Sequence, residues 1–194
     1  MKERPYHHGD LRNALRDAAR GILEEDGLQA LSLRAVARRA GVSHAAPYRH
    51  FSSHEALLAE LVGEGFEELR NDLAAAGAQS GAQADRITKM GAAYMRFIAR
   101  RPALARLMFG SQLANREAFP ELEEAANGVA VEIGNALNDS ALGLAVWGCV
   151  HGLAMLVLEN VIDLGQRRSG LDVLPSRAEI LLRGLFSLTD EKTH

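Results

Sequence analysis

Histidine and cysteine, the side chains that most often serve in catalysis and metal binding, are few in this chain of 194 residues. Cys149 and His151 lie two positions apart, so on a helix they point away from each other and cannot form a nucleophile and base pair. His50 and His54 are four apart, but a predicted break between two helices separates them. The chain has neither a glycine-rich phosphate loop nor a nucleophile elbow. We therefore expect no catalytic residue, no metal and no cofactor, and we predict that the protein is not an enzyme.

Basic side chains gather in the first quarter of the chain. Residues 1–50 hold nine Lys and Arg against six Asp and Glu, a balance of +3, whereas residues 51–194 hold thirteen against nineteen, a balance of −6. Four of the seven histidines lie in the same basic part. This division is typical of a module that meets a polyanion joined to one that does not, although a solvated basic face would give the same count.

The elements that must position these side chains are helices. Apolar residues recur at helical spacing over residues 10–27, with Arg12, Arg16 and Arg20 repeating on another face. Ser32 and Gly41 bracket a short helix, and a further short helix is predicted from Ser43 to about His50. Later helices are predicted from Ser52 or Ser53 to about 76, from about 86 to 100, over 104–109, 120–137, 140–158 and from 176 to the C-terminal end. With no strand-period run and no internal repeat, the chain is predicted to be all-α with about nine helices.

Residues 140–158 carry no formal charge and come close to the length needed to span a bilayer. His151 at mid-stretch, three glycines and acidic flanks argue against a membrane span. We expect a helix whose two apolar sides are both buried, one in the protomer and one against a second copy, so that the last two helices form a homodimer. The N-terminus has no apolar signal-peptide core and the single cysteine cannot form an internal disulfide, so we expect a cytoplasmic protein and no membrane.

Residues 33–50 have the dimensions of a helix-turn-helix, although an ordinary helical corner shares that spacing. The stretch LSLRAVARRAGVSHAAPYRHFSSHEALLAELV strongly resembles the TetR/AcrR family of bacterial transcriptional regulators, with Gly41-Val42-Ser43, Tyr48, His50-Phe51 and Ser53-x-Glu55-x-Leu57 in register. The resemblance implies an N-terminal three-helix domain with a recognition helix at 43–50, a connecting fourth helix and a dimer that binds a palindromic DNA operator. We expect a DNA-binding domain at 1–52 and an effector-binding and dimerisation domain at 53–194.

Each residue expected on the DNA side has chemistry that suits a contact. Hydroxyls at helix starts and the tips of Tyr48 and His50 can reach phosphates, whereas arginines and His44 can reach base edges or the backbone, and Ala45 can meet a thymine methyl. His54 stands where the family commonly has lysine, and Pro47 disturbs the first turn of the recognition helix. The expected DNA-binding residues are Ser32, Arg34, Ser43, His44, Ala45, Tyr48, Arg49, His50 and His54.

A second resemblance lies in Trp147-Gly148-Cys149-Val150-His151-Gly152, which looks like the Trp/His-Gly signature of one C-terminal class of that family. Aromatic and polar-tipped side chains of the C-terminal part could converge on a small-molecule pocket, although a plain packed core is the alternative for each. The expected effector-binding residues are Tyr94, Phe97, Met108, Phe109, Trp147 and His151. We expect a repressor that a small apolar molecule releases from DNA; the alternatives are a helical protein-interaction adaptor and a small α-helical enzyme.

Overall fold

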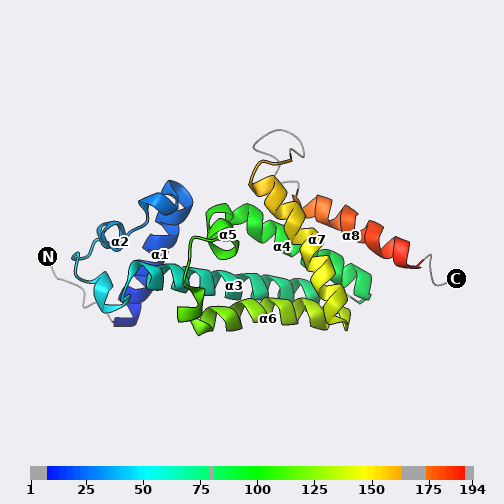
Figure 1. The fold of residues 1–194 in the computed structure, drawn as a ribbon, viewed down its shortest axis with the longest axis horizontal. Helices are drawn as coiled ribbons and strands as arrows, with labels where there is room; N and C mark the ends of the chain where they lie inside the picture. Colours follow the sequence, from blue (N-terminus) through cyan, green and yellow to red (C-terminus); the bar gives the residue numbers. More distant parts are fainter. Residues whose placement is uncertain (1–7, 79–80, 163–173, 191–194) are drawn as a thin grey trace. The chain divides into compact units, whose positions relative to one another are not determined.

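The structure is a computed structural model that describes residues 8–78, 81–162 and 174–190. These residues form helices and loops and contain no strand, so the all-α prediction is confirmed. The described part holds eight α-helices (Figure 1): α1 (His8–Asp26), α2 (Leu33–Arg39), α3 (His54–Ala78), α4 (Gln83–Arg100), α5 (Pro102–Phe109), α6 (Pro120–Leu137), α7 (Ser140–Leu158) and α8 (Leu174–Asp190). Three single 3-10 turns lie between them: η1 (Leu28–Ala30), η2 (Pro47–Arg49) and η3 (Arg116–Ala118).

The described residues pack into two compact units, and one helix belongs to both. The first unit draws on Met1–Gly65 and Ala103–Leu122, and the second on Phe66–Pro102 and Glu123–His194. The boundary crosses α3, so this 25-residue helix contributes its first half to one unit and its second half to the other. Within the first unit α5 packs on α3 so closely that a Cβ on Gly65 would lie 2.6 Å from Met108 Sδ.

Local caps fix the short helix α2. Its N-cap is Ser32, whose hydroxyl oxygen accepts the N–H of Ala35 at 3.1 Å. Gly41 ends it with φ 69°, a backbone conformation that glycine adopts without steric cost. The N–H of Val42 then donates to the carbonyl of Ala37 at 3.0 Å, which closes the last turn. The predicted start and stop of this helix are therefore both observed.

Residues 43–50 do not form the helix that the sequence pattern predicts. The segment turns at Ser43, whose carbonyl accepts the N–H of Ala46 at 3.0 Å, and its only helical element is the 3-10 turn η2. Pro47 explains the difference, because it lacks an N–H and its ring clashes with the carbonyl four residues earlier in an α-helix. Here Pro47 opens η2, where neither defect matters, and its side chain is buried. The predicted recognition helix at 43–50 is therefore corrected to a turn followed by η2.

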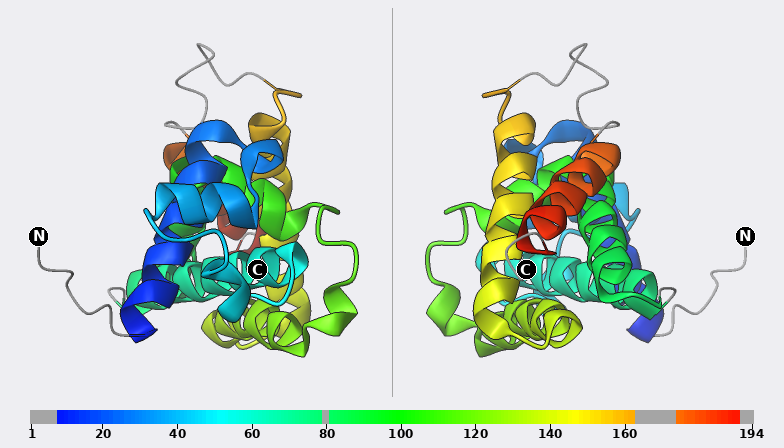
Figure 2. Two further views of the ribbon diagram at one scale, coloured as in Figure 1. Left: turned by 90° about the vertical axis from the view of Figure 1, so that its left-hand side faces the viewer. Right: turned by 90° about the vertical axis from the view of Figure 1, so that its right-hand side faces the viewer.

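In the second unit α4 is buried along most of its length, and α7 and α8 lie against it (Figure 2). Leu182 of α8 is fully buried and fills the space beside Gly91 that a Cβ would need. Helices α6 and α7 approach closely at Gly134 and Gly143, where a Cβ on Gly143 would lie 3.2 Å from the Cα of Gly134. Asp139 lies between these two helices and caps α7 by accepting two backbone N–H groups at 2.9 and 3.0 Å.

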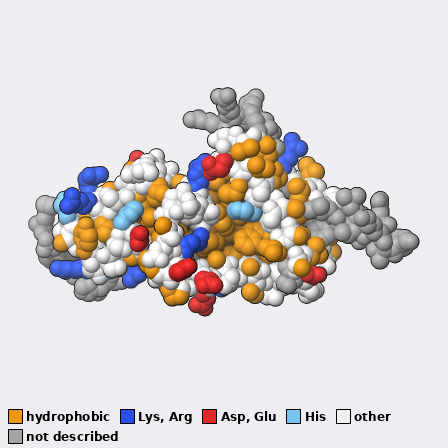
Figure 3. All heavy atoms as spheres, viewed as in Figure 1, with side chains coloured by type: hydrophobic (Ala, Val, Ile, Leu, Met, Phe, Trp, Pro, Cys, Tyr) orange, Lys and Arg blue, Asp and Glu red, His pale blue; other side chains and the backbone are white. Residues whose placement is uncertain are grey.

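Helix α7 buries only one of its two apolar sides in the protomer. Val150 and Ala154 are buried, whereas Leu144 is 66% exposed and Leu156 is 42% exposed. In the described part of the chain this is the one helix with the length and composition to cross a bilayer, and 33% of that stretch is buried; a core helix of a soluble protein has the same signature. Figure 3 shows hydrophobic side chains gathered where α7 passes.

Candidate nucleic-acid interface and ligand pocket

Eight of the nine residues predicted to contact DNA are exposed on the first unit. Tyr48 is 55% exposed, although tyrosine is a large and mostly apolar side chain. His50 is half-buried. The exposed set comprises Ser32, Arg34, Ser43, His44, Ala45, Tyr48, Arg49 and His54. They lie on α2, on the turn and η2, and at the first residue of α3, so one continuous stretch of chain presents hydroxyl, imidazole, phenol and guanidinium groups together.

Buried anchors hold this stretch in place. Phe51 follows η2, is 2% exposed, and packs beneath Arg12 of α1, whose guanidinium carbon lies 5.6 Å from the ring centroid. Its N–H donates to the carbonyl of Pro47 at 2.9 Å. The hydroxyl oxygen of Ser53 accepts the N–H of Ala56 at 3.0 Å and so caps α3. The turn, η2 and the start of α3 are therefore anchored on both sides of the exposed side chains.

The arginines of α1 do not belong to this surface, because they pair with glutamates of α3. Arg12 donates to both carboxylate oxygens of Glu60, at 3.0 and 2.5 Å, and Arg16 contacts Glu60 and Glu64. Arg20 completes the ladder at 3.0 Å from Glu64. The hydrogen bond from Arg12 lowers the pKa of Glu60, whereas burial raises the pKa of Glu64. The four-residue repeat of arginines on α1 thus joins α1 to α3.

On α2 and η2 the arginines are divided between pairing and exposure. Arg39 donates to Glu25 at 2.5 Å and lies 3.9 Å from Asp26. Arg34, Arg38 and Arg49 are exposed, and the structure gives them no ion pair with any described residue. Figure 3 shows arginine side chains on the surface of the first unit. On α2 and η2, three guanidinium groups are thus available to an anionic partner.

In the second unit, three predicted effector-binding residues meet. The hydroxyl of Tyr94 on α4 and Nδ1 of His151 on α7 share a hydrogen bond of 2.6 Å. The ring of His151 makes edge contacts with Tyr94 and Trp147 at centroid distances of 6.1 and 6.4 Å. Burial raises the pKa of Tyr94 and lowers the pKa of His151, so both groups are held uncharged.

Beside this cluster the second unit has an inner cavity of about 20 Å³. No charged side chain lines it; its lining is Leu73, Ile87, Met90, Gly91, Tyr94, Ile133, Val146, Trp147 and Val150. Most of these residues are aliphatic side chains that recur at helical spacing, and from the sequence alone such residues cannot be distinguished from ordinary core residues. Trp147 and Tyr94 are the two members that the sequence singled out.

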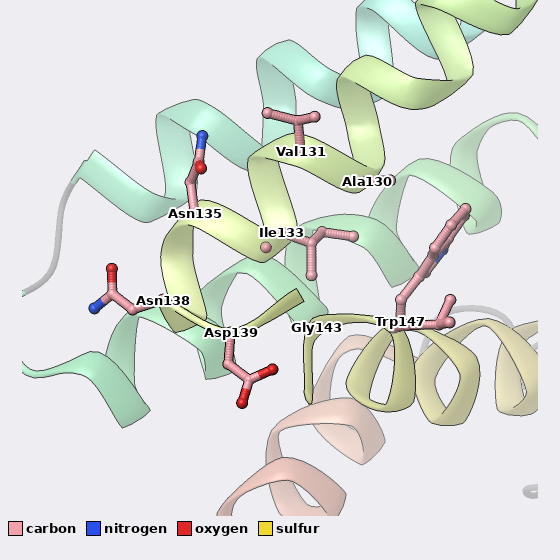
Figure 4. A pocket seen from close by; sticks show the side chains of 10 residues that line it. Ala130, Val131, Ile133, Asn135, Asn138, Asp139, Gly143 and Trp147 are labelled. Carbon is pink, nitrogen blue, oxygen red and sulfur yellow. The ribbon is translucent and has the colours of Figure 1, made fainter. Parts of the chain in front are cut away.

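An outer groove of about 690 Å³ runs between α6 and α7 (Figure 4). Ile133, Leu144 and Trp147 supply apolar surface, and Asn135 and Asp139 supply polar tips. Figure 4 shows Trp147 at one end of the groove and the polar side chains at the other. Its volume is in the range of small-molecule sites.

The remaining predicted effector-binding residues lie elsewhere. Phe97 is fully buried in α4 and lines neither the cavity nor the groove. Met108 and Phe109 belong to the first unit, where Met108 packs against Gly65. Over the residues that the structure describes, no three His, Cys, Asp or Glu side chains come together as a metal site.

Comparison with known proteins relates this architecture to a family of regulators. Residues 15–61 match the family model for bacterial regulatory proteins of the tetR family. A protein of unknown function from Rhodococcus sp. RHA1 is 32% identical, with a TM-score of 0.74 over 94% of this chain and 98% of that chain. No curated protein matches the sequence.

Two more distant solved structures share the fold. A TetR/AcrR-family transcriptional regulator from Thermobifida fusca YX-ER1 is 20% identical, with a TM-score of 0.69 over 89% of this chain and 96% of that chain. The transcriptional regulator FadR from Bacillus subtilis, solved in complex with stearoyl-CoA, is 16% identical, with a TM-score of 0.68 over 88% and 97%. Residues 15–61 therefore carry the sequence pattern of the tetR family of bacterial regulatory proteins, and the solved structures share the fold of the chain.

Proposed function

We propose that this protein is a cytoplasmic repressor that binds a palindromic operator as a homodimer and leaves it when a small, mostly apolar molecule binds the second unit. The observation that carries the proposal is the exposed stretch from Ser32 to His54 within the family match. Its polar side chains and three unpaired arginines face solvent on a well-anchored backbone. Such a surface suits a DNA groove and its phosphates.

Contact roles follow from side-chain chemistry. Tyr48 and His50 donate to phosphates and set the register, whereas His44, Arg34 and Arg49 reach base edges or the adjacent backbone. Because residues 43–50 form a turn and η2, the exposed tips belong to consecutive residues of a tight loop and not to one helix face. We propose His44 as the base-reading residue, because its exposed imidazole lies in the turn that precedes η2.

The dimer is proposed on α7 and α8. The exposed side of α7 is apolar at Leu142, Leu144 and Leu156, and Ile180 of α8 is 63% exposed. Gly148 on the same helix meets nothing within 4 Å of an added Cβ, so it leaves room for a second backbone to approach. Soluble proteins usually bury an apolar face of this kind against a partner, and in a symmetric homodimer the partner is the same face of a second copy.

The ligand is proposed to act through α3, which is shared by both units. We assign the C-terminal part to the Trp/His-Gly class on Trp147 and His151, and we place the effector beside them. FadR from Bacillus subtilis, solved with stearoyl-CoA, supports an effector that has a long apolar part for this fold. Allosteric coupling of about 1–3 kcal/mol changes operator affinity roughly five- to 150-fold, which is enough to release a repressor.

A gel shift with the protein's own promoter region, in the presence of unrelated competitor DNA, tests the proposal. Specific binding is expected for the unliganded protein. His44→Ala should change the preferred bases in a selection from random operators, whereas Tyr48→Phe should weaken binding to all sequences alike. Binding no better than to competitor DNA would refute the function, and an unchanged preference in His44→Ala would refute its role.

A further inference from the structure

Two side chains separate the outer groove from the inner cavity. Ile133 of α6 and Trp147 of α7 are the residues that line both spaces. Ile133 is 8% exposed and Trp147 is half-buried, so each has one side toward the groove and another toward the interior. Figure 4 shows Trp147 at the apolar end of the groove and Ile133 between it and the polar side chains. A molecule that lies in the groove therefore has the inner cavity directly behind these two side chains.

Trp147, one of these two side chains, carries a buried hydrogen-bond donor. Nε1 of Trp147 is buried and has no hydrogen-bond partner among the described residues. The Tyr94 hydroxyl is near this N–H, and the indole therefore lowers the pKa that burial raises, but the two groups do not meet as a hydrogen bond. The short hydrogen bond of that hydroxyl is the one it shares with Nδ1 of His151. A buried N–H that lacks an acceptor is unfavourable, and a ligand oxygen would relieve it.

The surroundings select against charge. The residues that line the inner cavity include no acid and no base, and the neighbouring Tyr94 and His151 are held uncharged by burial. An anion placed there would lose its hydration without meeting a cation. The cavity of about 20 Å³ has room for one acceptor group, whereas the groove of about 690 Å³ has room for the body of a small molecule.

We propose that the effector is an uncharged molecule, apolar apart from one hydrogen-bond acceptor, whose body lies in the groove between α6 and α7. Its acceptor passes between Ile133 and Trp147 into the inner cavity and takes the indole N–H. This inference rests on the proposed function, because it names the chemical class of that regulator's ligand.

Three probes with the same number of non-hydrogen atoms isolate the acceptor and the charge. Acetophenone carries a carbonyl, α-methylstyrene replaces its oxygen with CH2, and benzoate carries a negative charge. Calorimetric titration of the full chain should give acetophenone the tightest binding, roughly two- to twelvefold tighter than α-methylstyrene, as one net hydrogen bond provides. In Trp147→Phe that preference should disappear, and in the control Val161→Ala, an exposed residue just beyond the end of α7, it should remain.

A second readout does not depend on a variant. Trp147 is the single tryptophan, so the indole N–H gives one proton resonance. Acetophenone should shift this resonance downfield, and α-methylstyrene should not. The inference is overturned if benzoate binds as tightly as acetophenone, if Trp147→Phe keeps the preference, if the resonance does not respond, or if none of the three binds with a dissociation constant on the order of 1 mM or below.

Failure of this inference and failure of the proposed function give different results. A protein that binds its operator specifically but shows no preference for the ketone refutes only the ligand class. A protein that prefers the ketone but binds its promoter no better than competitor DNA refutes the regulator, and the pocket chemistry stands.

Discussion

Truncation of Leu144 to alanine should weaken the proposed dimer strongly while leaving each protomer folded. The side chain is 66% exposed in the protomer and lies on the apolar outer side of α7. Leu→Ala removes three methylene-sized groups, worth about 2.4 kcal/mol when buried completely. Scaled by the exposed 66%, the loss is about 1.6 kcal/mol per protomer and about 3 kcal/mol per dimer, which raises the dimer dissociation constant roughly 200-fold.

Sedimentation velocity over a dilution series measures this change directly. The control is Tyr48→Ala, because Tyr48 is exposed to a similar degree, 55%, but belongs to the first unit. The control should dimerise like the unmodified protein, and circular dichroism should show unchanged helix content in both variants. If Leu144→Ala dimerises within about threefold of the unmodified protein, the α7 face is not the dimer interface and the reasoning from exposed apolar area fails.

Three further sets of substitutions test the ion pairs, the helix packing and the start of α5. Unfolding experiments from pH 7 downward test the two glutamates of the ladder. Measured against Glu60→Gln, the stabilisation by Glu60 should be present above about pH 4.5 and fade as the pH falls, because the pKa of Glu60 is lowered in the folded protein. Measured against Glu64→Gln, the contribution of Glu64 should become more favourable as the pH falls, because its pKa is raised. Gly143→Ala should destabilise by about 1–3 kcal/mol in chemical denaturation, because its Cβ would meet the backbone of Gly134. The control Gly63→Ala should be neutral or slightly stabilising, because its Cβ would make an ordinary contact with Leu122 at 3.4 Å. Glu24→Ala should cost about 1–3 kcal/mol by the same measurement, since the carboxylate accepts the first N–H groups of α5 at 3.2 and 3.1 Å, and Glu24→Gln, which keeps an acceptor, should cost less.

Helix positions could be predicted from the sequence because caps and apolar period act locally. Ser32 and Gly41 bracket α2 as expected, and Pro102 ends the preceding helix at Arg100. The exception is Ser43–His50, where a family pattern predicts a helix and the proline ring forbids its first turn. There the missing N–H and the ring of Pro47 outweigh the family pattern that predicts a helix. The sequence indicates a disturbance of the first turn only, whereas the whole segment is non-α-helical.

The candidate sites could be predicted only in part. Exposure of the DNA-side residues follows from their polarity and short elements, and Trp147 with His151 follows from a four-residue spacing. The hydrogen bond between Tyr94 and His151 joins residues 57 apart in sequence, so no local signal reports it. The placement of Met108 in the first unit likewise depends on its tertiary contact with Gly65.

The arginine ladder on α1 also determines how the protein responds to ionic strength. Of the seven arginines between residues 8 and 50, Arg12, Arg16, Arg20 and Arg39 are already neutralised by glutamate or aspartate within the protomer. Only three of the seven remain to displace counterions from DNA. The described residues of each protomer therefore contribute about −3 to the slope of log affinity against log salt concentration, which is less than half of what all seven arginines would contribute. In the proposed dimer the two protomers together give a slope of about −5, so operator affinity falls roughly 10³-fold between about 50 and 200 mM salt. Discrimination between operator and bulk DNA must then come from base contacts such as that of His44.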